Sequence, residues 1–367
     1  MRIDGEYVLP LRWTSEVSRR DAGVLTDYLR RLSAWVDVTV VDGSDGPVFE
    51  SHRALWSAFV HHVPAAPWPG RNGKVAGVVT GVRAARHERV VIADDDVRYD
   101  ATSLAAVVLA LDSGELVRPQ NVFTSWPWHA RWDTGRALLN RALAHDHPGT
   151  LGVRRSCFLA MGGYDGDVLF ENLELVRTVR GAGGRVVELP GVFVGRLPPG
   201  TAHFWSQRVR QAYDDLAQPG RLLCELALVP ISVWLGWRRP TGLLVGAAAA
   251  VLLAETGRRR AGGAAVYPAS AALWALPWLA ERAVCVWLAL AQVPLGGASY
   301  CGGRIVKAAN PSRRLRSRAQ ALGEGVARQG CPARSSPMGP SGDAEQDAHD
   351  GDLEVPRAWP PTCAPRS

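Results

Sequence analysis

Cysteine is scarce in this chain and shows no paired spacing. The six cysteines are Cys157, Cys224, Cys285, Cys301, Cys331 and Cys363. A disulfide framework has cysteines at paired, regular spacings, and these six positions show none. We therefore expect reduced thiols rather than a fold held by disulfides.

Three further features are missing. Residues 1–20 carry charges of both signs and no continuous apolar core, so we expect no secretory signal and a catalytic part that stays in the cytoplasm. No internal repeat occurs. No RNA- or DNA-reading motif occurs either, although 42 Lys and Arg residues exceed 35 Asp and Glu residues. The excess positive charge favours an anionic membrane surface over nucleic acid as a partner.

The most informative segment that is present runs from Val90 to Val97. Four apolar residues lead into Asp94, Asp95 and Asp96. A buried strand that ends in clustered aspartates brings several negative charges together at the carboxyl edge of a sheet. A divalent cation offsets their repulsion, and hard carboxylate oxygens suit Mg²⁺ or Mn²⁺. The alternative is a solvated acidic turn.

Two upstream segments place this run in an α/β domain. β-branched residues at 38–41 lead into Asp42, which predicts a strand, and apolar residues at helical spacing follow Lys74. Strand, helix and strand, with an aspartate closing each strand, predict a mostly parallel sheet. Ligands of such sheets sit outside the carboxyl ends of the strands, so we expect Asp42 and residues 94–96 to face one crevice.

Three motifs in this order resemble those of the family 2 glycosyltransferases with the GT-A fold. They are Val40-Val41-Asp42-Gly43-Ser44, Asn72-Gly73-Lys74 and Asp94-Asp95-Asp96. The stretch from Gly73 to Arg98 is most similar to the ceramide glucosyltransferase branch, in which a lysine-led helix precedes an Asp-x-Asp-(Val/Ile)-Arg segment. The resemblance covers about residues 5–215 and implies a Rossmann-like α/β domain.

The resemblance also implies a role for each of these residues. Asp42 would bind the base of a nucleotide-sugar donor, and Lys74 would lie near the nucleotide, as would Asp95. Asp94 and Asp96 would match the two motif aspartates, one near the ribose and the other on the metal–diphosphate, and both are candidate metal ligands. A metal there neutralises the charge that develops on the departing diphosphate. The alternative for Lys74 is a surface lysine.

A second constellation resembles the acceptor side of the same family. A Gly-Gly-Tyr-Asp stretch ends at Asp165, and Glu171-Asn172 stands where the family has a Glu-Asp pair at the start of a helix. Because the amide of Asn172 cannot accept a proton, we predict Glu171 as the general base, with Asp165 or Asp167 as alternatives. The other interpretation is that Glu171 only caps its helix.

A third constellation, Gln207-Arg208-Val209-Arg210-Gln211, resembles the Gln-x-x-Arg-Trp motif of membrane-bound members. That motif lies above the donor diphosphate, and guanidinium groups suit phosphate. We therefore predict that Gln207, Arg208 and Arg210 bind the donor, although Gln211 replaces the tryptophan. A short basic amphipathic helix is the alternative.

The acceptor site is the least well marked part of the sequence. Trp126, Trp128 and His129 belong to an aromatic and basic cluster that suits a sugar face or a lipid. An interfacial aromatic belt or plain packing would produce the same pattern. His203 is a further candidate, whereas the histidines at 145 and 147 do not fit a metal-ligand spacing.

Apolar stretches at 222–237, 242–254 and 264–296 dominate the rear of the chain, separated by arginine clusters. We expect one interfacial helix followed by a two-span hairpin that returns the tail to the cytoplasm. This arrangement leaves Arg258–Arg260 outside, against the positive-inside tendency. Buried core helices of a soluble protein are the alternative.

These observations predict three regions: a GT-A domain at 1–215, interfacial and transmembrane helices at 216–310, and a disordered tail at 311–367. We expect a metal-dependent hexosyltransferase at the cytoplasmic membrane, with its catalytic domain in the cytoplasm. It would transfer a sugar, with inversion, from a nucleotide-diphosphate sugar to a lipid or lipid-linked acceptor. The alternatives are a processive polysaccharide synthase of the same family and a non-catalytic scaffold with a degenerate GT-A domain.

Overall fold

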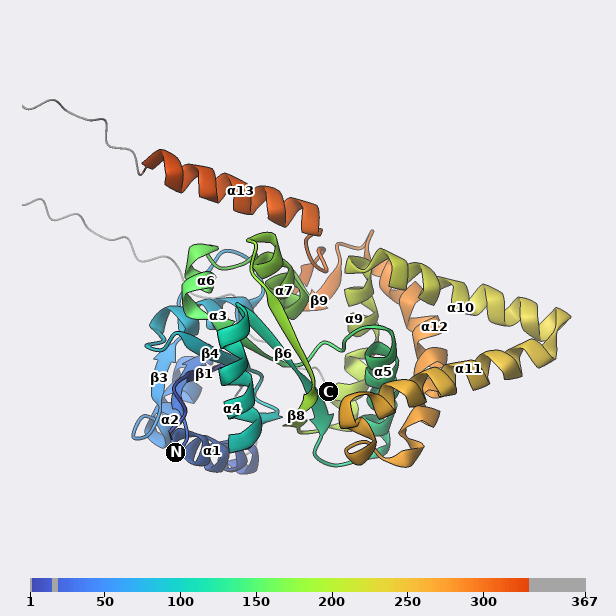
Figure 1. Cartoon of the computed structure of the whole chain (residues 1–367), viewed down its shortest axis with the longest axis horizontal. Coiled ribbons are helices and arrows are strands. Elements are labelled where there is room, and N and C mark those ends of the chain that lie inside the picture. Colours follow the sequence, from blue (N-terminus) through green and yellow to red (C-terminus); the bar gives the residue numbers. More distant parts are fainter. Residues whose placement is uncertain (1, 15–18, 330–367) are drawn as a thin grey trace, which may run out of the picture.

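A computed structural model describes residues 2–14 and 19–329 of the chain (Figure 1). Its centre is one eight-stranded sheet in the order β3-β2-β1-β4-β7-β6-β8-β5. The strands are β1 (Glu6–Leu11), β2 (Asp37–Asp42), β3 (His61–Pro64), β4 (Arg89–Ala93), β5 (Val97–Arg98), β6 (Leu116–Phe123), β7 (Thr150–Arg154) and β8 (Val186–Arg196). Strands β1 to β4 pair in parallel, as do β6 and β8, whereas β7 runs antiparallel to β4 and β6 and β5 runs antiparallel to β8. The predicted α/β fold with a mostly parallel sheet is confirmed.

Helices cover both faces of this sheet, which explains why its central strands are apolar throughout. Successive side chains of a strand point to opposite faces, so Tyr7 and Leu9 pack in one core and Val8 packs in the other. The first core includes side chains of α1 (Arg19–Ser33), α2 (Gly46–Trp56) and α4 (Ala101–Ala110). The second includes side chains of α3 (Gly73–Ala84), α6 (Arg155–Ala160) and α7 (Glu171–Gly181).

Two glycines let α3 lie unusually close to the sheet. A Cβ atom on Gly81 would stand 2.2 Å from Val8 Cγ1, and one on Gly77 would stand 2.8 Å from Pro10 Cβ. Asn72 caps the helix, since its side chain accepts a hydrogen bond from the backbone N–H of Lys74. The close packing and the cap together hold the first turn of α3 beside the strand ends.

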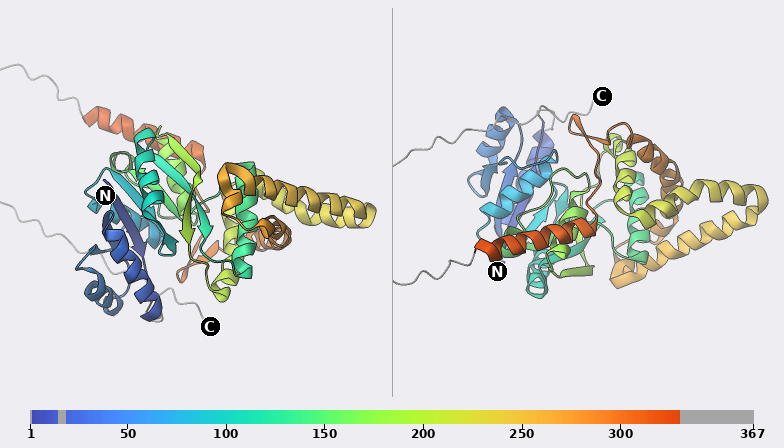
Figure 2. Two further views of the ribbon diagram at one scale, coloured as in Figure 1. Left: turned by 60° about the horizontal axis from the view of Figure 1, so that its bottom comes forward. Right: turned by 90° about the horizontal axis from the view of Figure 1, so that it is seen from above.

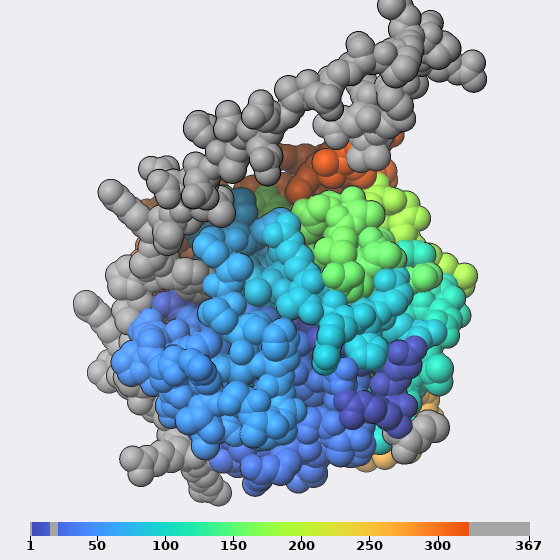
Figure 3. All heavy atoms as spheres, turned by 90° about the vertical axis from the view of Figure 1, so that its left-hand side faces the viewer, coloured from blue at the N-terminus to red at the C-terminus, as the bar shows by residue number. Residues whose placement is uncertain are grey.

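A group of helices lies beside the sheet (Figure 1). It comprises α5 (Trp128–Leu143), α8 (Thr201–Ser206), α9 (Arg208–Tyr213), η2 (Asp214–Ala217), α10 (Pro219–Arg238), α11 (Pro240–Arg259), η3 (Arg260–Ala265), η4 (Ala269–Trp274) and α12 (Ala275–Gln292). Among the described residues three segments are long and apolar enough to cross a membrane: Pro219–Arg238, Pro240–Ala265 and Ala269–Gln292. Helices α10 and α11 form a hairpin that projects away from the sheet (Figures 1 and 2). Figure 3 views the opposite side of the molecule, which is built largely from the first half of the chain.

The pairing of these helices differs from our expectation, which joined the second and third apolar stretches. The structure pairs the first two, α10 and α11, across a tight turn at Arg239. The base of α11 then returns to the domain, where Arg260 donates to the carbonyls of Arg141 and Ala144. Helix α12 packs against α10 as well as against α5 and α9, and its Glu281 and Arg282 form buried ion pairs with Arg208 and Asp215 of the domain.

The chain beyond α12 folds back onto the domain. Strands β9 (Ala298–Tyr300) and β10 (Gly303–Ile305) form a small hairpin, and α13 (Ser312–Gln329) packs on α7. Residues 312–329 are thus helical, although we expected disorder from residue 311; residues 330–367 lie outside the described part.

The state of one cysteine differs from a third expectation. Cys301, at the turn of the β9–β10 hairpin, is disulfide-bonded, so the prediction of reduced thiols is wrong at this position. Cys157, Cys224 and Cys285 are free, as expected, and the cysteines at 331 and 363 lie outside the described residues. Spacing along the sequence did not reveal the bond because it does not report which residues approach one another in space.

Candidate functional site

A cavity of about 1090 Å³ opens at the carboxyl ends of β1, β2 and β4. Its wall includes Asp94, Asp95 and Asp96, which follow β4, and residues from α3, α7, α9 and α12. The β9–β10 hairpin contributes Tyr300 and Cys301 from the other side. The crevice therefore lies where parallel α/β sheets bind their ligands.

Lys74 links two carboxylates in this cavity. Its Nζ lies 2.5 Å from Asp94 Oδ1 and 2.6 Å from Glu171 Oε1. Burial opposes the charge on the ammonium, but the attraction of Asp94 and Glu171 outweighs it and raises the pKa of Lys74 above its ordinary value. The first turns of α3 and α7 are thereby joined to the end of β4 by one ion-pair triad.

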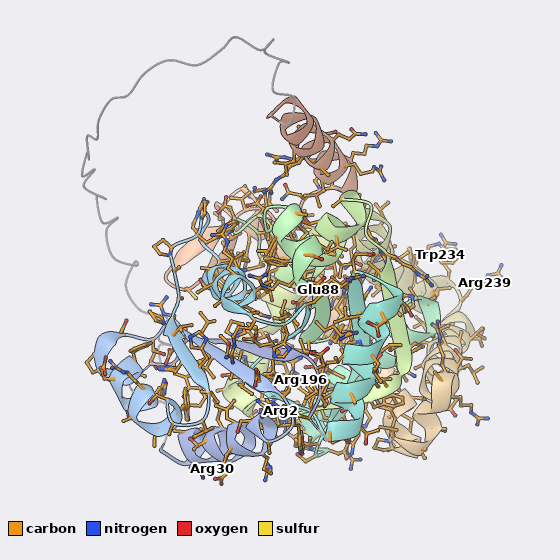
Figure 4. All side chains as sticks on the ribbon, turned by 60° about the vertical axis from the view of Figure 1, so that its left-hand side comes forward. Arg2, Arg30, Glu88, Arg196, Trp234 and Arg239 are labelled. Carbon is orange, nitrogen blue, oxygen red and sulfur yellow. The ribbon has the colours of Figure 1, made fainter. Side chains whose placement is uncertain are left out.

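Asp96 is held by Arg196, a residue for which the sequence offered no motif. Arg196 ends β8, and its Nε donates to Asp96 Oδ2 at 2.7 Å. Figure 4 shows Arg196 within the body of the domain. The attraction of Asp96 is the main cause that raises the pKa of Arg196. The other oxygen, Asp96 Oδ1, is buried and has no hydrogen-bond partner among the described residues.

These carboxylates fit a divalent cation in one respect. A buried carboxylate oxygen without a donor, such as Asp96 Oδ1, is a ligand that Mg²⁺ or Mn²⁺ accepts. Within the part of the chain that the structure describes, no group of three or more His, Cys, Asp or Glu side chains could hold a metal by itself. A cation at Asp96 would therefore need further oxygen ligands from a bound anion.

Asp95 points away from that position. Its Oδ2 accepts a hydrogen bond from Trp13 Nε1 at 2.6 Å, and burial raises the pKa of Asp95 above the ordinary value. The Trp13 backbone N–H donates in turn to Ser44 Oγ, which lies just beyond β2. Asp95 thus tethers the loop after β1 to the wall of the cavity.

Asp42 does not line the cavity, which corrects the expectation that it faces the crevice. It is only 1% exposed; its Oδ1 accepts from the Ser44 N–H, and its Oδ2 lies 2.7 Å from His52 Nδ1 and 3.1 Å from His62 Nε2. Burial opposes ionisation, but the hydrogen bonds from His52 and His62 lower the pKa of Asp42 below its usual range. Both oxygens are occupied inside the protein, so this arrangement does not support contact with a base.

Arg208 forms part of the cavity wall, but its donors are used within the protein. Its guanidinium lies 2.6 Å from Asp133 Oδ1 and 3.4 Å from Glu281 Oε2, and it is 3% exposed. A buried arginine paired with two carboxylates braces α9 against α5 and α12. The predicted phosphate contact from Arg208 is therefore not supported by its position.

Arg210, Gln207 and His203 all contribute to the cavity wall, as predicted for a donor or acceptor site. Arg210 donates a hydrogen bond to Gln207 Oε1 at 3.1 Å. The Arg210 guanidinium also lies over the Tyr300 ring, 5.0 Å from its centroid. Burial, reinforced by Arg210 and Arg196, lowers the pKa of His203, so its imidazole is neutral at pH 7.

The aromatic cluster after β6 is packing rather than cavity wall. Trp126 meets Tyr267 edge to face, and Trp128 packs on Phe204 and its neighbours in α8. His129 is buried, with 7% of its surface exposed. None of these three residues lines the cavity, and their contact with an acceptor stays a prediction.

The two reserve bases also lie outside the cavity wall. Asp165 Oδ2 accepts from Lys307 Nζ and Asn310 Nδ2, both at 2.8 Å, and Asp167 pairs with Arg71 at 3.1 Å. The two contacts of Asp165 fasten the segment after β10 to the domain, and the pair of Asp167 with Arg71 joins two loops of the domain. Of the three predicted bases, only Glu171 lines the cavity.

Three acidic residues of the cavity wall, Asp133, Asp214 and Asp215, were missed by sequence reasoning. Asp214 begins η2 directly after α9, and its Oδ1 is buried without a partner among the described residues. Burial is the main cause that raises the pKa of Asp214 to about 8, with Asp215 and Glu171 adding to it against Arg210. Its position three residues after the Gln207–Gln211 motif was the only signal in the sequence.

Comparison with known proteins gives structural likenesses only. No family model matches the chain, and no curated protein matches it in sequence. The mannosyltransferase PcManGT from Pyrobaculum calidifontis, solved with GDP-Man and Mn²⁺, shares 18% identity at a TM-score of 0.44, over 89% of this chain and 87% of that one. Mannosyl-3-phosphoglycerate synthase from Rubrobacter xylanophilus has 15% sequence identity and a TM-score of 0.38, over 60% of this chain and 76% of that one. Glucosyl-3-phosphoglycerate synthase from Mycobacterium tuberculosis has 13% sequence identity and a TM-score of 0.37, over 55% of this chain and 74% of that one.

Proposed function

We propose that this protein is a membrane-associated, metal-dependent glycosyltransferase with a GT-A-like domain of family 2 type. It transfers one hexose from a nucleotide-diphosphate sugar to a lipid or lipid-linked acceptor, with inversion. The observation that carries the proposal is the cavity at the strand ends, in which Asp94–Asp96 stand among the cations Lys74, Arg196 and Arg210.

This arrangement suits a departing nucleoside diphosphate. Arg196 and Arg210 present guanidinium groups in the cavity wall, and such groups match the geometry of phosphate oxygens. Asp96, with Asp94 beside it, would hold Mg²⁺ or Mn²⁺ together with diphosphate oxygens. When bound there, such a cation would neutralise the negative charge that develops as the bond between the sugar and the diphosphate oxygen breaks. Lys74 keeps Asp94 and Glu171 in place and limits their mutual repulsion.

The α10–α11 hairpin supports attachment to a membrane. Each helix has 20 residues, which at 1.5 Å per residue is about 30 Å and matches the hydrocarbon thickness of a bilayer. The hairpin exposes large apolar side chains that include Leu244 and Trp237, which are 73% and 79% exposed. Figure 4 shows Trp234 and Arg239 on this projecting part. Two spans with a polar tip explain this distribution.

The same hairpin favours a cytoplasmic domain. Arg258–Arg260 lie at the base of α11, where Arg260 bonds to α5, so the cluster stays on the side of the cavity. Three arginines at this end outnumber Arg238 and Arg239 at the tip, so the positive-inside tendency favours this side as the cytoplasmic one. Helix α12 is held against the domain at both ends, so we infer that it lies at the interface rather than across the bilayer.

The test is nucleoside diphosphate release by the detergent-solubilised full chain. The assay supplies a panel of nucleotide sugars, Mg²⁺ or Mn²⁺, and a lipid extract of the expression host. We expect release from one donor that requires the metal and disappears in Asp96→Asn. Asp27→Asn, on the exposed face of α1, is the matched control and should keep full activity. If folded protein releases no nucleoside diphosphate from any donor of the panel, the result would favour the non-catalytic scaffold.

A polysaccharide synthase is the second candidate from the same site. Passage of a polymer across the bilayer needs a channel, and the described residues contain only three apolar segments of sufficient length. Mass spectrometry of the product separates the two, since a single transfer adds one hexose mass and a processive enzyme gives a ladder.

A further inference from the structure

Two buried hydrogen-bond acceptors face the cavity from consecutive turns of α9 and η2. Gln211 Oε1 and Asp214 Oδ1 both have no partner among the described residues, and both residues contribute to the cavity wall. They are three positions apart in a helical segment, so their side chains lie on one face. A buried acceptor without a donor is costly, and two together call for a ligand that brings hydroxyl or amine protons.

The neighbouring helix α7 does not offer an equivalent free acceptor. Glu171 Oε1 accepts from Lys74 Nζ at 2.6 Å, and this ammonium also pairs with Asp94. A proton arriving on Glu171 would have to displace that ion pair. Asn172, which lines the cavity beside it, donates its amide to the Pro148 carbonyl at 3.2 Å. Glu171 Oε1 is thus engaged in an ion pair, and the Asn172 amide cannot take up a proton.

We propose that Asp214 is the catalytic base that removes the proton from the acceptor hydroxyl, and that Gln211 accepts a second hydrogen bond from the same acceptor. This inference rests on the proposed transferase function. The acceptor oxygen forms a bond to the anomeric carbon while the bond from that carbon to the diphosphate oxygen breaks. The electron pair leaves on the nucleoside diphosphate, and the hydroxyl proton passes to Asp214, which later releases it to solvent.

The position of Asp214 in the chain suits an acceptor that arrives from a bilayer. It begins η2, and α10, the first helix of the projecting hairpin, starts five residues later at Pro219. A lipid hydroxyl at the membrane surface would therefore meet this end of the cavity first. Lys74 and Asp94, which we propose lie at the site of the nucleotide-sugar donor, are in the part of the cavity next to the strand ends.

The charges around Asp214 make it responsive to pH. Glu171 from α7 and its neighbour Asp215 disfavour ionisation, whereas Arg210 from α9 and Arg282 from α12 favour it. Burial has the largest effect, and the pKa of the Asp214 carboxyl is raised to about 8. Only the ionised form accepts a proton, so the transfer rate should rise with pH through this value. A base whose pKa lies near the working pH is well matched to proton transfer.

The experiment compares the pH dependence of transfer in the wild-type full chain and three variants in detergent. Donor is saturating, Mn²⁺ is present, and the lipid extract supplies the acceptor; nucleoside diphosphate affinity and thermal unfolding are measured in parallel. Asp214→Asn should lower kcat by about 10²- to 10⁴-fold and abolish the rise near pH 8. Its affinity for the nucleoside diphosphate should stay within about twofold, because the donor end is intact. Asp214→Glu keeps a carboxylate and should shift the rise rather than remove it.

Glu171→Gln is the variant that discriminates between the two candidate bases. Under the proposal it keeps the rise near pH 8 even if its overall rate falls. The proposal is overturned if Asp214→Asn keeps that rise, or if Glu171→Gln alone removes it. If wild type fails to turn over any donor, the proposed function fails and this inference falls with it. Loss of folding in Asp214→Asn leaves the Asp214→Glu and Glu171→Gln profiles to decide.

Discussion

Replacement of Lys74 with methionine would remove the cation that separates Asp94 from Glu171. The three side chains are largely buried, at 23%, 23% and 11% exposed, so water screens the remaining charges poorly. Removal of one member of a buried ion pair typically costs about 3–5 kcal/mol. We expect about 3 kcal/mol here, at the lower end, because all three groups retain some contact with the cavity. In a domain of this size that corresponds to a fall in Tm of about 6–12 °C.

Thermal unfolding in detergent, followed by circular dichroism, measures this loss. The matched control is Arg30→Met, which breaks an ion pair with Asp27 on α1 whose side chains are 64% and 72% exposed. Such a surface pair contributes at most about 1 kcal/mol. The double variant Lys74→Met/Glu171→Gln should recover part of the lost stability, since one uncompensated carboxylate is gone. If Lys74→Met is no less stable than Arg30→Met, the triad does not hold these elements together.

Two further outcomes follow from the packing and the hairpin. Gly81→Ala should destabilise the protein by about 1–3 kcal/mol in the same unfolding assay, since its Cβ would stand 2.2 Å from Val8 Cγ1. Gly23→Ala in α1, whose Cβ meets nothing within 4 Å, should stabilise it by about 0.5–1 kcal/mol. In sealed vesicles, Arg239→Cys should react with an impermeant thiol reagent on the side opposite to Arg259→Cys, relative to wild type. Reaction of both cysteines from one side would refute the two-span hairpin.

The strand β4 and the carboxylates of Asp94–Asp96 at its end were predictable because they are local. An apolar run followed by carboxylates fixes both the strand and the position of its charged end, without any knowledge of distant residues. The cap at Asn72 and the helix after it are local in the same way. Accordingly, the cavity lies where the sequence placed it, at the carboxyl ends of β1, β2 and β4.

The errors arose where partners come from distant parts of the chain. His52 and His62 enclose Asp42 from α2 and β3, and no motif announces them. Arg196 reaches Asp96 from 100 positions along the sequence. Burial also separates residues of the same motif. In the cavity wall Arg210 bonds to the neutral Gln207, whereas the buried guanidinium of Arg208 is paired with Asp133. Residue types alone did not distinguish these environments.

The β9–β10 hairpin joins α12 to the end of the cavity that holds Lys74. Tyr300 donates its hydroxyl hydrogen bond to Asn72, the cap of α3, at 2.8 Å, and the guanidinium of Arg210 lies over its ring. The chain reaches this hairpin directly from α12, so this part of the cavity wall is attached to the helix that we propose lies at the membrane surface. Linkage is reciprocal: if a lipid environment stabilises the seated position of α12, it also raises donor affinity, and a bound donor holds α12 in place by the same free energy. A chain cut before β9 would lose part of its substrate site as well as its tail.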